Sequence, residues 1–191
     1  MLLVPDFIKG IAAKGLARKL ATRLGGDLTQ EGGPSPKVHV HGQHRGLKVE
    51  VFLAVTWGHV AVTVSTQPKG DLYFRLRSSA ALKRMAPGRD RDYEALDFAS
   101  GLVMSWSRDD HRLDARRIVA SLDPGLRERM LSTVKGNSGW SHTADGLECD
   151  RAVSVFSGPE RVIEALDLAC DVAQGIEALA AQPGFRNADS A

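Results

Sequence analysis

A long run of alternating apolar residues constrains this chain more than any other feature. From Leu47 to Trp57 every second residue is apolar, and the alternation resumes over residues 60–64 after Gly58. Successive side chains of a β-strand point to opposite faces, so this pattern is typical of a strand buried on one face. Two such strands joined by a tight turn must run antiparallel. The sequence therefore predicts a hairpin over residues 47–57 and 60–64 inside an antiparallel sheet.

The remaining periodicities place helices at both ends of the chain and further strands between them. Apolar residues at helical spacing predict helices over 6–24, 113–122, 124–135 and from residue 158 onward. Further strands are expected over 38–42, 72–77, 101–107, 140–143, 147–150 and 152–156, a short helical segment over 78–85 and a charged surface excursion over Asp90–Asp97. We expect an α+β fold: an antiparallel sheet of about six to seven strands, with helices packed on one face and helices at both termini. Residues 1–182 are predicted to form a single domain and residues 183–191 a frayed tail.

Composition narrows the class of protein. Hydrophobic residues make up 43% and charged residues 25% of the 191 positions, which is typical of a globular domain. The chain contains no apolar run of about 18 residues, and its N-terminus lacks the pattern of a secretory signal. Its two cysteines, Cys149 and Cys170, are expected to be reduced, and Cys170 is expected to be buried because it lies on a predicted amphipathic helix. These features predict a cytoplasmic protein.

Charge is distributed unevenly along the chain. Residues 1–139 carry 22 Lys and Arg against 14 Asp and Glu, whereas residues 140–191 carry 3 against 9. The pI of about 8.6 is below the value of about 9 that is typical of nucleic-acid-binding domains, which argues against a nucleic-acid partner. A basic body and an acidic C-terminal helix can instead attract each other, within one molecule or between two.

The N-terminal helix also suggests a membrane-surface hypothesis. Lys9, Lys14, Arg18 and Lys19 lie on its polar side, and a basic amphipathic helix can bind an anionic bilayer. The favoured interpretation is that the helix packs on the sheet with these side chains in water. Gly10 and Gly15 weaken it as an isolated helix.

A cluster of histidines is the feature of the sequence that most suggests a metal-binding or catalytic site. His39 and His41 would share one face of a strand, and His44 would approach from the following turn. The spacing resembles the first metal-binding segment of the metallo-β-lactamase superfamily, with Gln43 where that motif has aspartate. Three histidines, or two with an acid such as Glu50, could ligate zinc and leave one position for water. The alternative is a polar edge strand without metal.

Aromatic and basic residues supply candidates for a protein-binding surface. Trp57 and Trp106 fall on apolar faces of strands, so both are predicted to be core residues. Trp140 lies between Gly139 and Ser141 and is predicted to be exposed. Together with it, the interaction candidates are Arg112, Arg116 and Arg117 on the predicted helix over 113–122.

Over residues 16–182 the chain resembles a group of uncharacterised bacterial proteins without an assigned activity. The matching positions are Leu24-Gly25, Val40-x-Gly42 to Gly46, Leu122-x-Pro124-x-Leu126 and Asp145-Gly146-Leu147. The group tends to carry Phe-Asp before its central strand, where this chain has Leu96-Asp97-Phe98. The matches are turn and core positions, so the resemblance implies the fold and supplies no catalytic residue.

The leading functional hypothesis is a non-enzymatic interaction or assembly module of a cytosolic bacterial system, which binds a protein partner or itself. Motifs for nucleotide binding and for a nucleophilic serine are absent from the sequence. One alternative is a metal-dependent hydrolase that uses His39, His41 and His44. A second is a peripheral membrane protein anchored by the N-terminal helix. No cofactor is expected, except zinc under the hydrolase hypothesis.

Overall fold

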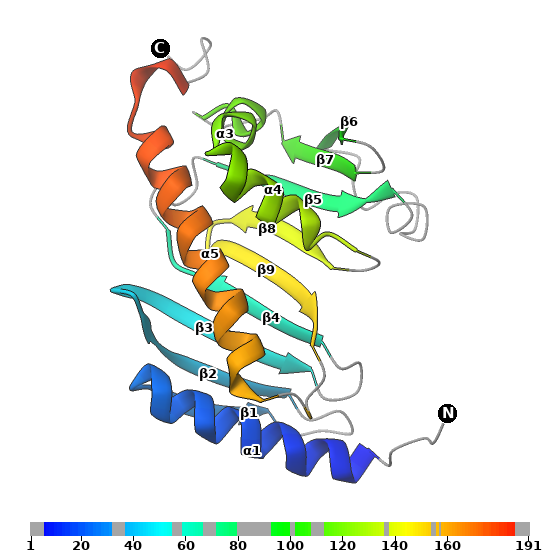
Figure 1. Ribbon diagram of the computed structural model, residues 1–191, viewed down its shortest axis with the longest axis vertical. Helices are drawn as coiled ribbons and strands as arrows, with labels where there is room; N and C mark the ends of the chain where they lie inside the picture. The colour runs from blue at the N-terminus through cyan, green and yellow to red at the C-terminus, as the bar shows by residue number, and fades with distance from the viewer. Residues whose placement is uncertain are drawn as a thin grey trace.

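The fold is one antiparallel sheet with helices on one side (Figure 1). The computed structural model describes residues 6–31, 37–54, 59–66, 72–79, 93–99, 102–107, 113–135, 138–153, 156 and 158–185. In this part of the chain nine strands pair in the order β1-β2-β3-β4-β9-β8-β5-β7-β6. The strands are β1 (Asp27–Glu31), β2 (Lys37–His44), β3 (Leu47–Ala54), β4 (His59–Val64), β5 (Phe74–Ser78), β6 (Tyr93–Ala99), β7 (Leu102–Ser107), β8 (Gly139–Thr143) and β9 (Gly146–Ala152).

The described helices are α1 (Asp6–Leu24), α3 (Ala115–Ser121), α4 (Pro124–Ser132), α5 (Pro159–Ala180) and the 3-10 turn η1 (Pro183–Phe185). Figure 1 shows α1 along β1 and β2, and α5 crossing the sheet obliquely over β2, β3, β4 and β9. Both pack on the face that carries the buried side chains of Val38, Val40 and Val62. The Asp114 and Asp123 carboxylates cap α3 and α4 by accepting a backbone N–H bond three residues on.

The predicted fold class is confirmed, including the terminal helices and the helix-bearing face. The central hairpin is also confirmed, because β3 and β4 pair antiparallel from Val49↔Val64 to Ala54↔His59. Residues 55–58, which include Trp57, lie outside the described residues. The predicted helical segment over 78–85 lies almost entirely outside them too.

The sheet has nine strands, more than the six or seven expected. Two of them, β1 and β6, were missed, whereas the separate strand expected over 152–156 does not form in its described residues, since Ala152 ends β9. All five residues of β1 are exposed, so this edge strand has no apolar alternation to reveal it. The prediction of a surface excursion over Asp90–Asp97 was wrong for residues 93–97, which belong to β6 and pair with β7. β1 is held in the sheet by its backbone pairing with β2 rather than by apolar burial, and hydropathy does not record backbone pairing.

The C-terminal end of the described chain packs on α3. Residues 183–185 of the predicted tail form η1, where the Phe185 carbonyl accepts a hydrogen bond from the Asp114 backbone N–H. The Arg117 guanidinium lies 5.6 Å from the centre of the Phe185 ring. These contacts tie the turn after α5 to the start of α3.

Cys149 and Cys170 are free thiols, as predicted, and both are buried. Burial raises the pKa of Cys149 to about 12 and that of Cys170 to about 11. Both side chains are therefore protonated at neutral pH, which is typical of inert core cysteines.

A buried histidine links three segments of the core. His142 is 1% exposed, and its Nδ1–H donates to the Leu72 carbonyl at 2.7 Å. Its Nε2 is then unprotonated and accepts from the Thr66 hydroxyl at 2.8 Å. Each ring nitrogen of the neutral imidazole therefore has a hydrogen-bond partner, and the buried side chain has no unpaired polar atom.

The contact of α1 with the sheet depends on a glycine. A Cβ added to Gly42 would lie 2.6 Å from the Leu24 Cβ, whereas one added to Gly15 on the exposed side of α1 would meet nothing within 4 Å. We expect Gly42→Ala to lower the free energy of unfolding by about 1–3 kcal/mol through overpacking. Gly15→Ala should raise it by about 0.5–1 kcal/mol through helix propensity. Urea denaturation of both variants tests this, and a neutral Gly42→Ala would contradict the close packing of α1 on β2.

His142 predicts a pH dependence of stability. Burial lowers its pKa below the ordinary 6.5, although the Leu72 carbonyl acts in the opposite direction. Between the lowered pKa and about 6.5 the unfolded chain therefore binds a proton that the folded chain does not. The contribution of His142 is complete above about pH 6.5 and is lost as pH falls toward its folded-state pKa, by up to about 1.4 kcal/mol per pH unit.

Urea denaturation from pH 8 to pH 5 measures this dependence, with His142→Gln as the variant that cannot titrate. The difference in unfolding free energy between wild type and variant should shrink as pH falls below 6.5. A difference that is constant across the range would show that His142 does not contribute in this way.

Candidate functional site

Strand alternation divides the histidines of β2 between the two faces of the sheet. Val38 and Val40 are buried under the helices, so His39 and His41 point to the opposite face. On the neighbouring strand β3, Glu50 pairs directly with His41, and Phe52 pairs with His39. Burial of the valines thus places two imidazoles and one carboxylate together on the face away from α1 and α5.

The three polar side chains form a compact cluster. His39 Nδ1 is 2.6 Å from Glu50 Oε1, and His41 Nδ1 is 3.8 Å from Glu50 Oε2. The two imidazole rings are nearly parallel, with an interplanar angle of 9° and centroids 6.1 Å apart. One ligand atom of each residue lies within 4.8 Å of the other two. Among the described residues, this cluster is the group whose donor types and spacing suit a metal ion.

Strand β1 lies beside the cluster, on the side away from β3. The Thr29 hydroxyl oxygen lies 3.5 Å from His41 Nε2, and Glu31 Oε1 lies 3.8 Å from His39 Nε2. The Phe52 ring packs against the His39 ring with centroids 4.9 Å apart. Each imidazole therefore has Glu50 at Nδ1 and an oxygen of β1 near Nε2.

A cleft of about 580 Å³ adjoins this cluster. His41 and Glu50 belong to its wall, so the cluster and the cleft are continuous. The complete lining is Gly25, Gly26, Asp27, His41, Gly42, Gln43, Lys48, Val49, Glu50, Thr63, Ser65 and Asp145. These are mostly polar groups and backbone, which suits a polar ligand or water rather than an apolar one.

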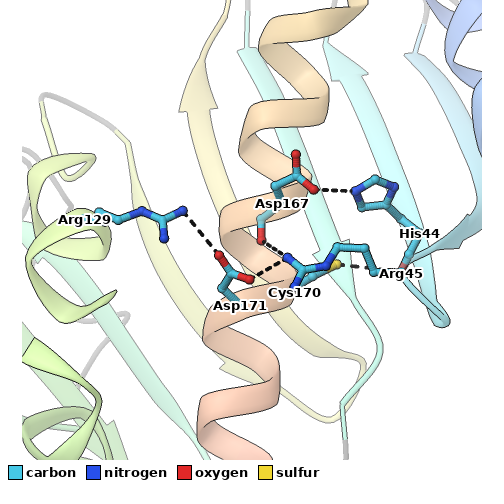
Figure 2. A network of polar contacts seen from close by, with 6 residues as sticks. All are labelled: His44, Arg45, Arg129, Asp167, Cys170 and Asp171. Atoms are coloured by element: carbon cyan, nitrogen blue, oxygen red, sulfur yellow. Dashed lines mark hydrogen bonds and ion pairs between the residues drawn. The ribbon is translucent and has the colours of Figure 1, made fainter. Parts of the chain in front are cut away.

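His44, the third histidine of the predicted metal set, does not join the other two. It is an even-numbered residue of β2 and points to the helix-bearing face, where its Nε2 lies 2.8 Å from Asp167 Oδ1 of α5 (Figure 2). The structure thus brings together His39 and His41 with Glu50, and separates His44 from them. The prediction that His44 approaches from a turn failed because β2 continues through residue 44 and alternation holds to its end.

Instead, His44 belongs to a polar network that fastens the β2–β3 turn to the helices, and Figure 2 shows its members. Arg45 donates from Nη1 to Asp171 Oδ1 at 2.5 Å and to the Asp167 carbonyl at 3.3 Å. The other Asp171 oxygen accepts from Arg129 of α4 at 3.3 Å. The hydrogen bond from Arg45 to Asp171 raises the pKa of the guanidinium, so this cation stays charged. The network is structural: it joins β2, α4 and α5.

The residues predicted to form a protein-binding surface differ from one another in their exposure to solvent. Trp140, predicted to be exposed, is 0% exposed and belongs to the core. Its indole N–H donates to the Met130 carbonyl of α4 and to the hydroxyl of Thr133, the C-cap of that helix, because Trp140 lies on the helix-bearing face of β8 between Leu76 and Cys149. Arg112 lies outside the described residues, whereas Arg116 and Arg117 are exposed on α3.

The basic residues of α1 lie as the packed-helix interpretation predicts. Lys14, Arg18 and Lys19 are exposed, and Lys9 is half-buried. The apolar side of α1 is already buried against the sheet and α5, and its buried residues are Ala13, Leu16, Ala17, Leu20 and Leu24. No helix in the described part of the chain is both long and apolar enough to cross a bilayer.

The opposite charges of the two regions meet within the molecule. Arg23 at the end of α1 pairs with Glu160 at the start of α5, with 2.8 Å between their atoms. Asp171 of the same acidic helix binds Arg45 and Arg129. The sequence left open whether this attraction acts within one molecule or between two, and these ion pairs show that it acts within one.

Comparison with known proteins shows a shared fold. No family model and no curated protein matches this sequence. A crystal structure of the mycobacterial trehalose monomycolate transport factor A, TtfA, is similar to this chain with a TM-score of 0.58 and 16% sequence identity. The match covers 86% of this chain and 94% of that one. At this identity the likeness shows the fold alone.

The polar network on α5 predicts a measurable contribution to stability. We expect Asp171→Ala to lower the free energy of unfolding by about 1–2 kcal/mol, because one carboxylate serves two guanidinium groups and is only 26% exposed. Glu164→Ala is the matched control on the same helix, since Glu164 and its partner Arg161 are 59% and 70% exposed. Its cost should stay below about 0.5 kcal/mol. Equal losses in urea denaturation would contradict a special role for the Asp171 network.

Proposed function

We propose that this protein is a non-enzymatic interaction or assembly module of a cytosolic bacterial system, and that it binds a protein partner through the uncovered face of its sheet. The observation that carries the proposal is the one-sided coverage of the sheet. α1 and α5 cover one face, and no described helix packs on the other. We call this other face the open face.

The registers define two rows of residues across the middle of the open face. One row runs through Phe52, Ala61, Asp150, Gly139 and Arg77 on five adjacent strands. The other runs through Glu50, Thr63, Glu148, Ser141 and Arg75. Small residues thus form much of the floor, with an aromatic ring at one side and two guanidinium groups at the other. Gly139 and Ser141 are buried, and the Arg77 side chain lies where a Gly139 side chain would be, so a partner would meet mainly the charged side chains of the two rows, which can give specificity.

Several polar groups of the open face are buried at a cost in free energy that binding of a partner would reduce. Among the described side chains, His39 Nε2 and Arg77 Nη1 are buried without a hydrogen-bond partner. An unsatisfied buried polar group costs about 1–3 kcal/mol. The Glu148 carboxyl is partly buried, and burial together with Asp150 raises its pKa although Arg77 and Arg75 oppose this. A partner that rearranged the side chains around these two nitrogens and gave each a hydrogen bond would offset these costs.

The shared fold is compatible with such a role. The similar protein is described as a transport factor, which is compatible with a non-enzymatic role. Because the charged regions of this chain pair internally, the open face is a better candidate surface than the α1 and α5 charges.

A bulky substitution in the open face tests the proposal. Ala61 lies in the middle of one row and is half-buried, so Ala61→Arg should obstruct a partner there. Gln174→Arg on the exposed side of α5 is the matched control with the same added charge. Affinity capture followed by cross-linking mass spectrometry should identify a partner that contacts the open face. Its recovery should fall at least about tenfold with Ala61→Arg and stay unchanged with Gln174→Arg.

Circular dichroism and thermal unfolding establish that both variants keep the fold. Recovery of the same partner by wild type and Ala61→Arg would contradict the proposal. Cross-links confined to α3 or α5, or a chain that captures no partner and is monomeric by light scattering, would contradict it as well.

A further inference from the structure

We propose that His39, His41 and Glu50 form a binding site for one divalent transition-metal ion of the zinc type. Two imidazoles and one carboxylate form a donor set that zinc uses with three protein ligands and one exchangeable position. This inference goes beyond the proposed interaction role, because it concerns the isolated chain and needs no protein partner.

The backbone already holds the three ligands at fixed positions. His39 and His41 are two residues apart on β2, and Glu50 is the direct cross-strand partner of His41. β2 lies inside the sheet, paired to β1 on one side and to β3 on the other, so the Cα positions are fixed by two ladders. Only side-chain rotation is needed to bring the ligand atoms together.

The required rotation is small. Metal–ligand bonds of 2.0–2.2 Å place the ligand atoms of a tetrahedral site about 3.3 Å apart. In the structure the three ligand atoms lie within 4.8 Å of one another, and the two contacts to Glu50 are 2.6 and 3.8 Å. The His41 and Glu50 side chains are 49% and 38% exposed, so both can adjust.

The surroundings of the cluster also suit a metal. Ligating imidazoles commonly donate their second ring N–H to a carboxylate, a carbonyl or another oxygen, which fixes the tautomer. Here Glu31 Oε1 lies 3.8 Å from His39 Nε2, and the Thr29 hydroxyl oxygen lies 3.5 Å from His41 Nε2. With both Nδ1 atoms bound to the ion, both Nε2 atoms carry protons directed at β1. The buried His39 Nε2 without a hydrogen-bond partner then becomes a donor with Glu31 beside it.

A fourth ligand has access to the ion. His41 and Glu50 line the cleft of about 580 Å³, so water or a small anion can reach the metal from there. Three protein ligands with an open position are typical of sites that exchange a ligand, whereas structural zinc sites are closed by four protein ligands.

Titration of the purified, tag-free full chain with zinc chloride in a calorimeter tests the site. We expect one ion per chain, and we expect His41→Ala and Glu50→Gln each to weaken zinc binding at least about tenfold. His44→Ala is the matched control, since it removes a histidine of the same strand that points to the other face. The His44→Ala variant should bind zinc with unchanged affinity, although it loses the contact between His44 and Asp167 of α5. Cobalt chloride should give the visible absorption of a tetrahedral site in wild type and in His44→Ala, but not in His41→Ala.

Three results would overturn the inference: no saturable zinc binding by the wild-type chain, equal affinities for wild type and Glu50→Gln, or equal losses for His41→Ala and His44→Ala. Circular dichroism of each variant excludes loss of fold as the cause, and Glu50→Gln remains informative if a histidine variant does not fold. The Ala61→Arg variant should keep its zinc affinity. Failure of the proposed interaction role and failure of the metal site are therefore separate outcomes.

Discussion

Burial of one apolar face of the sheet beneath α1 and α5 is the constraint on which the rest of the structure depends. Val40, Val51 and Val62 lie side by side across β2, β3 and β4, and all are 0% exposed. Because side chains alternate along a strand, burying these residues also fixes what the other face carries. A register shift of one residue would expose the valines and bury His41 and Glu50, so core packing and the candidate site are set by the same alternation.

Helix α5 does more than cover the sheet. Its buried side packs on β4 and β9, while its acidic side receives Arg23 of α1, Arg45 of the β2–β3 turn and Arg129 of α4. Segments far apart in the sequence are thereby joined to one element (Figure 2). Two acids of the C-terminal region, Glu160 and Asp171, are thus paired within the molecule. The proposed binding surface is therefore the open face rather than these charged positions.

The two proposed activities occupy neighbouring parts of the open face. The metal cluster lies at the β1–β3 side beside the cleft, whereas the two rows of the open face continue across β4, β9 and β8. Phe52 belongs to both regions, since it packs on His39 and pairs with Ala61. In both proposals the covered face gives stability, and the open face carries the binding groups.

The sequence by itself determined the α+β class, the central hairpin, the capped helices and the pairing of His39 with His41 on one face, because local periodicity encodes them. Tertiary structure decided the rest. Backbone pairing with β2 formed β1, which has no apolar alternation, and pairing with β7 placed residues 93–97 in β6. Extension of β2 to residue 44 turned His44 toward Asp167, and packing of α4 buried Trp140. Glu50 completes the cluster through cross-strand register, a contact between chain segments that periodicity along one segment does not specify.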